Sequence, residues 1–261
     1  MDKASLIASL AETEEDKILL ARVYDKIMNG YSRQIPAVTA FLTPREQALT
    51  SSLLRGTDLV FFGGAEEAER KICCYLPEYL TEDYLLEEDG PIRAVRAEFY
   101  AGDTLTHRDF LGSLMGSGIK RETVGDIFVS EGSCDFFVTA EILPYLLQNL
   151  TSAGRTKLHL RTIGLEEVAL PQTKTREIRS TVSSLRLDSI ITVGFGLARA
   201  KAAAAVEVGK VTLNHMTVEK PDKSVSAGDV IALRGMGKIC LQDVGGKTRK
   251  DRTTVTVLRY E

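Results

Sequence analysis

Four basic residues in the last third of this sequence are candidates for binding phosphate groups. Arg199 and Lys201 fall in the first turn of an expected helix, where unbonded backbone N–H groups and the positive end of the helix dipole attract anions. Arg186 lies on the preceding expected helix, and Lys210 begins an expected strand. Arginine offers a phosphate a bidentate fork, whereas lysine offers a point charge. The alternative is that all four are ordinary solvated surface charges.

A basic segment nearer the C-terminus is a second candidate for contact with a phosphate backbone. Residues 245–252 combine two glycines with four cations, which suits close approach to phosphates. A plain β-hairpin turn is equally compatible with this segment. The full set of candidate binding residues is Arg186, Arg199, Lys201, Lys210, Asn214, Lys238, Lys247, Arg249 and Lys250.

Charge is distributed unevenly along the chain, although the whole carries only −3. Residues 1–173 hold 17 Lys and Arg against 27 Asp and Glu, a net of −10, whereas residues 174–261 hold 16 against 9, a net of +7. A basic segment that faces a polyanion, attached to an acidic body, has this asymmetry. A randomly basic surface would have it too, so charge alone leaves both interpretations open.

Several fragments imitate catalytic or cofactor motifs, and each lacks a required residue. The tripeptide at 107–109 has the His-Arg-Asp order of a kinase catalytic loop, but Leu114 stands where that loop needs a metal-binding Asn. The tripeptide at 246–248 echoes a phosphate-binding loop, yet Leu241 replaces its first glycine. The three histidines have no cysteine or histidine at ligand spacing. We therefore expect no enzyme activity, no catalytic residue, no metal and no cofactor.

The four cysteines, Cys73, Cys74, Cys134 and Cys240, are too few and too scattered for a disulfide framework or a tetrahedral metal site. The adjacent pair is expected to be two buried, small apolar side chains rather than a redox pair. No apolar run approaches the roughly 20 residues that span a bilayer. The first five residues lack the features of a secretory signal. We expect a cytoplasmic protein without a membrane span.

Residues 1–90 are predicted to form a mainly helical N-terminal region. Over residues 17–28 one helical stripe is expected to hold the apolar side chains Ile18, Leu19, Val23, Ile27 and Met28. A second helix is expected to begin at Thr43, because Pro44 suits the first helical position and Glu46 completes a capping box. A short buried strand is expected at 59–62, a helix at 66–74 and an acidic loop at 81–90.

Residues 91–165 follow the order β-α-β-β-α-β of a ferredoxin-like domain. Strands are expected at 92–100, 126–130, 134–139 and 157–163, with helices at 106–116 and 141–150. Four aromatic residues on these strands are able to stack on bases, although such residues more often belong to a core. They are Phe99, Phe128, Phe136 and Phe137. The order of elements alone leaves the role of this domain open.

Residues 166–182 are polar and contain Pro171, which predicts a linker, and residues 183–261 form a C-terminal module. Its first helix is expected to begin at Ser183, and its second covers 198–208 and stops at Gly209. Strands at 210–214 and 230–233 predict a small curled sheet, and a final strand is expected at 253–258.

The C-terminal module resembles the RNA-binding domain first described in the fourth protein of the small ribosomal subunit. The residues that carry this resemblance are Arg186-Leu187-Asp188, Arg199-Ala200-Lys201-Ala202, Gly209-Lys210-Val211, Asn214, Val218, Pro221 and Gly228-Asp229-Val230-Ile231. Two positions depart from that family's pattern. Ala198 stands where a serine usually caps the second helix, and His215 follows Asn214 where the family turn commonly has glycine.

The chain as a whole resembles the YlmH family of bacterial proteins. The matching stretches are Phe41-Leu42-Thr43-Pro44-Arg45-Glu46, Gly63-Gly64 with Ala68-Glu69-Arg70-Lys71, and Leu105-Thr106-His107-Arg108-Asp109-Phe110-Leu111-Gly112 with Gly118-Ile119-Lys120-Arg121. This resemblance covers nearly the whole chain. It implies a helical N-terminal portion, a middle domain assigned to RNA binding, and association with the large ribosomal subunit during rescue of stalled nascent chains, with peptidyl-tRNA nearby.

Together these observations predict an α+β protein with a helical N-terminal region, a ferredoxin-like middle domain and a small C-terminal RNA-binding module of two helices and a curled sheet. We expect a non-catalytic protein that binds structured rRNA or tRNA, with the large ribosomal subunit as its partner. Two alternatives stay open. One is an RNA-modifying enzyme that uses the module only for targeting, and the other is an adaptor whose acidic N-terminal region binds a protein partner.

Overall fold

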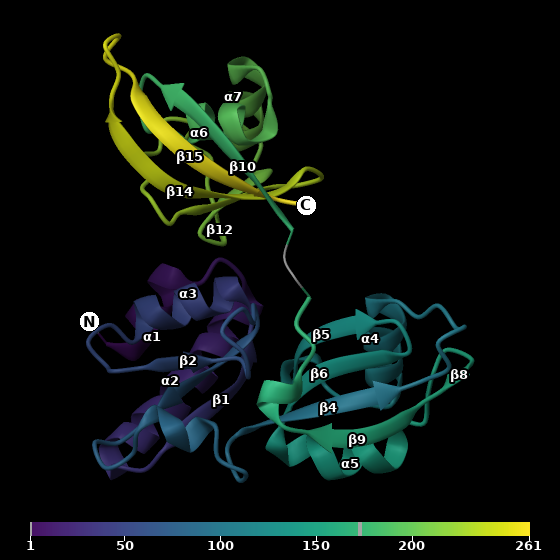
Figure 1. Cartoon of the computed structure of the whole chain (residues 1–261). Coiled ribbons are helices and arrows are strands. Elements are labelled where there is room, and N and C mark those ends of the chain that lie inside the picture. Colours follow the sequence, from purple (N-terminus) through teal and green to yellow (C-terminus); the bar gives the residue numbers. More distant parts are fainter. Residues whose placement is uncertain (1, 172–173) are drawn as a thin grey trace. The chain divides into compact units, whose positions relative to one another are not determined.

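The computed structural model describes residues 2–171 and 174–261, which Figure 1 shows coloured along the chain. The chain forms two compact units, unit 1 (residues 1–171) and unit 2 (residues 172–261). Residue 1 lies outside the described residues. It belongs to the N-terminal segment for which no secretory signal was expected. Residues 172–173 of the expected linker also lie outside the described residues.

The N-terminal part of unit 1 packs helices against a three-stranded antiparallel sheet of order β1-β3-β2 (Figure 1). Its elements are α1 (Lys3–Leu10), α2 (Glu14–Arg33), β1 (Ala37–Leu42), α3 (Pro44–Leu53), β2 (Val60–Phe62), β3 (Lys71–Tyr75) and the 3-10 helix η1 (Glu82–Leu85). On α2 the buried apolar side chains are Leu20, Val23 and Ile27. The helix predicted over 17–28 is therefore confirmed as part of α2, but the predicted apolar stripe is only partly right, because Ile18 is 54% exposed and Leu20 is completely buried.

Capping boxes fix the starts of α2 and α3. The carboxylate of Glu46 accepts a hydrogen bond from the backbone N–H of Thr43 at 2.6 Å, and the Thr43 hydroxyl accepts one from the N–H of Glu46 at 3.4 Å. Pro44 occupies the first turn, so the predicted helix start is confirmed. Thr13 and Asp16 form an equivalent box at α2.

Residues 66–74 do not form the helix that was expected there. Lys71–Tyr75 is instead β3, the central strand of the sheet, with β1 and β2 paired on either side. Alanine, glutamate and lysine favour a helix locally, but this preference is weak compared with burial and pairing on both edges. Ile72, Cys73 and Cys74 are completely buried. The helical N-terminal region thus also contains a sheet, and its strand β2 is half-buried rather than buried.

The C-terminal part of unit 1 is a four-stranded antiparallel sheet of order β5-β6-β4-β9 (Figure 1). Its main elements are β4 (Ile92–Glu98), α4 (His107–Gly116), β5 (Val124–Ser130), β6 (Ser133–Thr139), α5 (Leu143–Asn149) and β9 (His159–Ile163). Short elements between them are η2 (Arg121–Thr123), η3 (Ala140–Ile142), β7 (Ser152–Ala153), β8 (Thr156–Lys157) and η4 (Leu165–Glu167). This order and pairing confirm the predicted ferredoxin-like fold.

The two faces of this sheet bury different partners, as the two-residue period of a strand requires. Val95 and Phe136 face α4 and α5, whose Phe110 and Leu146 are completely buried. Ala94 and Phe137 belong to another core cluster, which also contains Phe41, Ile72 and Cys74 from the N-terminal sheet. Residues 1–171 therefore share apolar packing across the expected boundary at residue 90.

Unit 2 is a six-stranded antiparallel sheet of order β10-β15-β14-β13-β11-β12 with two helices (Figure 1). Its elements are β10 (Thr175–Val182), α6 (Leu187–Phe195), α7 (Arg199–Glu207), β11 (Val211–Leu213), β12 (Met216–Thr217), β13 (Val230–Leu233), β14 (Gly237–Lys247) and β15 (Thr253–Tyr260). Leu187, Ile190 and Ile191 of α6 are buried in one core cluster with the sheet. A Cβ atom at Gly194 would lie 2.4 Å from Cδ1 of Ile239, so any larger residue would have to displace this buried side chain.

Part of the segment expected to be a linker, 166–182, is the strand β10, which pairs along its length with β15. Its partner lies far along the chain, so neither the polarity of the segment nor Pro171 indicated the pairing. The first helix of the module begins at Leu187 rather than Ser183, because its N-cap Arg186 has an extended backbone. The second helix stops before Gly209, which has a φ of 67°, as predicted.

Among the residues that the structure describes, no single helix is long and apolar enough to cross a membrane. The bent pair of α6 and α7 passes that test together, by length and composition only.

Candidate nucleic-acid interface

Two guanidinium groups, from the starts of α6 and α7, converge on the carboxylate of Asp188. Arg186 donates from Nε and Nη2 to the two carboxylate oxygens, each at 3.2 Å. Arg199 donates from Nε to Oδ2, also at 3.2 Å. Arg186 is the N-cap of α6 and Arg199 is the first residue of α7, so the two helix starts bring these side chains together. We name Arg186, Asp188 and Arg199 the arginine clamp.

The arginine clamp is buried at its carboxylate and exposed at its guanidinium groups. The side chain of Asp188 is 4% exposed, against 39% for Arg186 and 54% for Arg199. Burial raises the pKa of Asp188, but the hydrogen bonds and charges of the two arginines lower it by more, and the pKa lies below its usual value. The carboxylate is therefore ionised at neutral pH. Two positive charges share one negative charge, and both guanidinium groups remain accessible to an external anion.

A groove of about 480 Å³ adjoins the arginine clamp. Three arginines line it, Arg179, Arg199 and Arg252, together with hydroxyl groups of serine and threonine. Arg252 is fixed by Thr181, whose hydroxyl accepts from Nε at 2.9 Å and whose carbonyl accepts from Nη2. Guanidinium and hydroxyl donors are the groups that bind phosphate oxygens in nucleic-acid complexes. The sequence did not indicate Arg179, and it indicated Arg252 only as part of the basic segment 245–252. The pairing of β10 with β15 brings the two arginines to the same groove.

Lys201 and Lys210 are both exposed, on α7 and immediately before β11. Neither makes a hydrogen bond or ion pair through its ammonium group within the described residues. Ala198 is the N-cap of α7 and supplies no side-chain hydrogen bond, as its replacement of serine implies. The first N–H groups of α7 thus lack a side-chain cap beside Arg199. The structure leaves the binding roles of Lys201 and Lys210 as predictions.

Asn214 is used within the fold. Its side-chain oxygen accepts from the backbone N–H of Val230 at 2.9 Å, and its amide donates to Asp229 at 2.8 Å. Asn214 and His215 both have positive φ, 48° and 68°, in the two-residue turn between β11 and β12. This is the turn geometry that an Asn-Gly pair favours, so His215 does not change the turn type. Contact between Asn214 and RNA stays a prediction.

The remaining predicted cations lie along β14 and the turn that follows it. The ammonium group of Lys238 is 4.7 Å from the ring centroid of Tyr260, and Lys247 pairs with Asp251 at 2.6 Å. Arg249 and Lys250 are exposed in the turn. The carbonyl of Arg252 accepts a hydrogen bond from the N–H of Thr248 at 2.7 Å and closes this turn, and Arg252 itself lines the groove. Lys238 lies at the opposite end of β14.

The aromatic residues of the middle sheet do not form an open stacking platform. Phe136 and Phe137 are completely buried. Phe99 packs on Phe110 and Phe128 on Phe137, with ring centroids 5.8 Å and 6.0 Å apart. The interpretation of Phe136 and Phe137 as core residues is confirmed, and these two rings cannot reach a base without unfolding.

The cysteines behave as apolar side chains. Cys73, Cys74 and Cys134 are buried, and burial raises the pKa of the Cys73 thiol to about 12. The expectation for the adjacent pair is confirmed. Among residues 2–171 and 174–261, no group of three or more His, Cys, Asp or Glu side chains is placed to hold a metal ion.

Comparison with known proteins gives two family matches. Residues 99–167 match the family described as "Putative RNA-binding domain in YlmH", and residues 185–231 match the S4 domain. The first covers most of the ferredoxin-like part of unit 1. The second covers the arginine clamp and the turn at Asn214.

Two known proteins are similar over long stretches. The Bacillus subtilis (strain 168) protein named "Ribosome-associated protein quality control protein P2" is 37% identical over 228 residues, which are 86% of this chain and 87% of that protein. A solved structure named "Cell division protein ylmH from Streptococcus pneumoniae" covers 60% of this chain and 96% of its own, with 20% identity and a TM-score of 0.50, a likeness of fold. From the two domain matches and the extent of the Bacillus similarity, the chain belongs to the YlmH family.

Proposed function

We propose that this protein binds structured RNA, rRNA or tRNA, without catalysing a reaction on it, and that it acts on the large ribosomal subunit in quality control of stalled translation. The name of the Bacillus relative and the two RNA-binding families support the ribosomal role. In this proposal the arginine clamp and its groove hold phosphates, and the hairpin cations at 247–250 add contacts.

The observation that carries the proposal is the surplus of positive charge at the arginine clamp. Asp188 is buried and ionised, so it orients both guanidinium groups, but it can neutralise only one of them. Arg186 and Arg199 therefore stay positioned and charged in the unbound protein. Donors that are already oriented lose less side-chain entropy when they bind a phosphate.

A binding role rather than a catalytic one fits the chemistry of the groove. Its polar lining consists of guanidinium and hydroxyl groups from β10, α6, α7 and the turn before β15. These groups donate hydrogen bonds to phosphate oxygens and hold them in place. We further propose that the acidic N-terminal region contacts a protein partner. Residues 1–90 carry 9 Lys and Arg against 17 Asp and Glu, and cross-linking to neighbours on purified complexes tests this contact.

Co-sedimentation with purified ribosomal subunits tests the proposed function. The full chain is expected to pellet with the large subunit at about 50 mM salt and to be released as salt rises, because phosphate contacts weaken steeply with ionic strength. Arg199→Ala/Lys201→Ala is expected to reduce this association, whereas the charge-matched control Arg176→Ala/Arg234→Ala changes exposed arginines outside the clamp. Absence of association at low salt would argue against the ribosomal role.

A further inference from the structure

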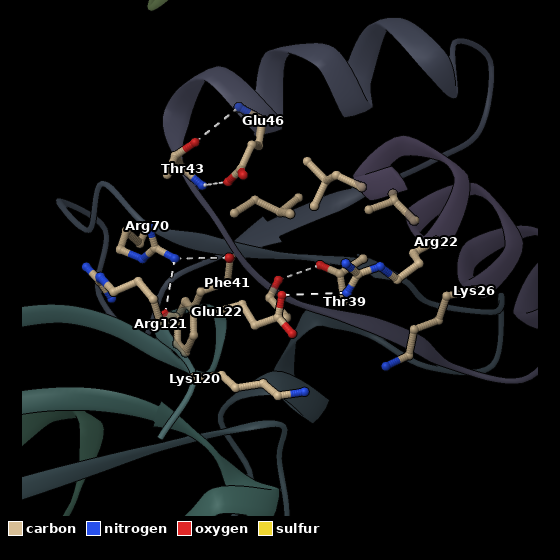
Figure 2. A pocket seen from close by; sticks show the side chains of 14 residues that line it. Arg22, Lys26, Thr39, Phe41, Thr43, Glu46, Arg70, Lys120, Arg121 and Glu122 are labelled. Carbon is tan, nitrogen blue, oxygen red and sulfur yellow. Dashed lines mark hydrogen bonds and ion pairs between the residues drawn. The ribbon is translucent and has the colours of Figure 1, made fainter. Parts of the chain in front are cut away.

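Unit 1 contains a pocket of about 720 Å³ between its N-terminal elements and residues 120–122, the segment just before β5 (Figure 2). Its walls come from α2, β1, the start of α3, the residue before β3, and the segment around η2. The volume falls within the range of roughly 300–1,000 Å³ that is typical of small-molecule sites. All the residues that line the pocket belong to unit 1, and none of them is part of the arginine clamp.

The pocket is basic although the unit around it is acidic. Its lining contains five cations and two carboxylates, in a segment, residues 1–173, whose net charge is −10. The cations are Arg22, Lys26, Arg70, Lys120 and Arg121. Both carboxylates are already engaged, Glu46 with the N–H of Thr43 at 2.6 Å and Glu122 with Arg22 at 3.7 Å (Figure 2).

Arg70 and Arg121 are held in place by backbone carbonyl groups, which position a guanidinium without neutralising it. Arg70 donates to the carbonyls of Phe41, Val124 and Arg121, at 3.0 to 3.4 Å. Arg121 donates to the carbonyls of Val124 and Gly125. Burial lowers the pKa of both arginines, and the charge of Arg70 lowers the pKa of Arg121 further. The carboxylate of Asp126 raises both pKa values, and that of Glu46 raises the pKa of Arg70, but by less than burial lowers them. Two half-buried cations side by side are stabilised by any anion that enters the pocket.

Two lysines at the rim add to the positive charge of the pocket. Lys26 and Lys120 are exposed and make no hydrogen bond or ion pair through their ammonium groups within the described part of the chain. The apolar side chains of Leu19 and Val23 line the wall that α2 contributes. The pocket therefore offers a cationic region for phosphate groups and, on the same cavity wall, an apolar surface for a ring system.

We propose that this pocket binds a phosphorylated nucleotide, with Lys26, Arg70, Lys120 and Arg121 around the phosphates. The lining has an excess of three positive charges, which suits the negative charge of a nucleoside diphosphate. It also suits a nucleotide within an RNA strand together with its flanking phosphates. The two sources share one chemistry, a nucleoside joined to phosphate. The site goes beyond the function proposed for unit 2 and does not depend on it.

Isothermal titration of the full chain with ADP tests this site, with adenosine and inorganic phosphate as partial ligands. ADP is expected to bind at one site per chain, more tightly than either partial ligand. Lys26→Glu/Lys120→Glu is expected to weaken binding at least about tenfold, equivalent to about 1.4 kcal/mol. Both lysines are exposed, so the variant keeps its fold. The matched control is Arg108→Glu/Lys157→Glu, a reversal of two exposed cations of unit 1 outside the pocket.

The proposal is overturned if ADP does not bind at about 1 mM, if inorganic phosphate binds as tightly as ADP, or if the control loses as much affinity as the pocket variant. Competition by a 5′-phosphorylated RNA dinucleotide identifies RNA as the source of the nucleotide, and its failure to compete identifies a free nucleotide. Arg199→Ala/Lys201→Ala is expected to bind ADP normally, which separates failure at this pocket from failure at the clamp.

Discussion

Each unit of this protein has an aspartate–arginine cluster at the start of a helix, and the two clusters differ in stoichiometry. In unit 1, Arg45 binds Asp16 through two hydrogen bonds of 2.6 and 2.9 Å and also binds Glu12 at 2.8 Å. In unit 2, Asp188 is shared by Arg186 and Arg199 at 3.2 Å. Two carboxylates surround one cation in the first cluster, whereas two cations surround one carboxylate in the second.

The arginines are also more exposed in the cluster that has an excess of positive charge. Arg45 is 30% exposed, while Arg186 and Arg199 are 39% and 54% exposed. The unit 1 cluster satisfies its guanidinium and joins α2 to α3. The unit 2 cluster keeps an accessible positive charge. The same residue types therefore make a structural tie in one place and a candidate phosphate site in the other, according to which charge is in excess.

The largest effect is expected from breaking the unit 1 tie. Asp16→Ala removes a buried carboxylate that both caps α2 and binds Arg45, and one-sided loss of such a pair costs about 3 kcal/mol. Since the chain has no tryptophan, peptide-resolved hydrogen exchange is a suitable measure of the free energy of unfolding. The loss is expected in unit 1 peptides. Lys17→Ala, which breaks an exposed pair with Glu14, is the control, expected to change stability by less than about 0.5 kcal/mol.

Low pH is expected to remove the contribution of Asp16 to the free energy of unfolding. Its hydrogen bonds with Arg45 hold the pKa of the folded state well below the usual value. A carboxylate whose pKa is lower in the folded than in the unfolded state stabilises the fold when it is ionised. This stabilisation is complete above the unfolded pKa of about 3.9 and is lost as pH falls through the folded pKa. The stability difference between wild type and Asp16→Ala should therefore be constant from about pH 5 to neutrality and shrink below about pH 4. A difference that grows on acidification would contradict this account.

A smaller destabilisation is expected in unit 2. Asp188→Ala leaves Arg186 and Arg199 without their shared acceptor, and hydrogen bonds to charged groups contribute about 2 kcal/mol. Hydrogen exchange should rise in peptides covering α6 and α7 and stay unchanged in unit 1. An equal loss in both units, or no loss in either, would show that the carboxylate does not organise the clamp.

The smallest effect concerns Asn214, which the sequence grouped with the basic candidates. Asn214→Ala removes its hydrogen bonds to Val230 and Asp229, so we expect a loss of about 1 kcal/mol in unit 2 stability. If Asn214 also contacts RNA, as predicted, the folded variant should bind RNA more weakly than wild type in a filter-binding titration. Wild-type affinity would restrict Asn214 to its role in the fold.

The sequence indicated features that depend on neighbouring residues. The capping box of Thr43 and Glu46, the ferredoxin-like order and the basic start of α7 are all local patterns. It failed where distant segments decide the structure. Lys71–Tyr75 becomes a strand because β1 and β2 pair with it, and Thr175–Val182 becomes a strand because β15 does.

The candidate site divides in the same way. Arg186 and Arg199 were found by type and spacing, but the burial of Asp188 between them depends on the packing of α6 and α7. The approach of Arg252 to Thr181 depends on the register of β10 and β15. The basic pocket of unit 1 had no local signal, because its cations come from segments that only the tertiary fold assembles.

The salt dependence of RNA affinity tests the central claim most directly. Binding of a purified tRNA and of a large-subunit rRNA hairpin would be titrated over about 50–300 mM salt for wild type, Arg199→Ala/Lys201→Ala and the control Arg176→Ala/Arg234→Ala. Removing two phosphate contacts should lower affinity about tenfold and reduce the slope of log affinity against log salt by about 1 to 2, while the control keeps the wild-type slope. If the folded clamp variant retained both the affinity and the slope of wild type, the arginine clamp would not be the RNA-binding surface.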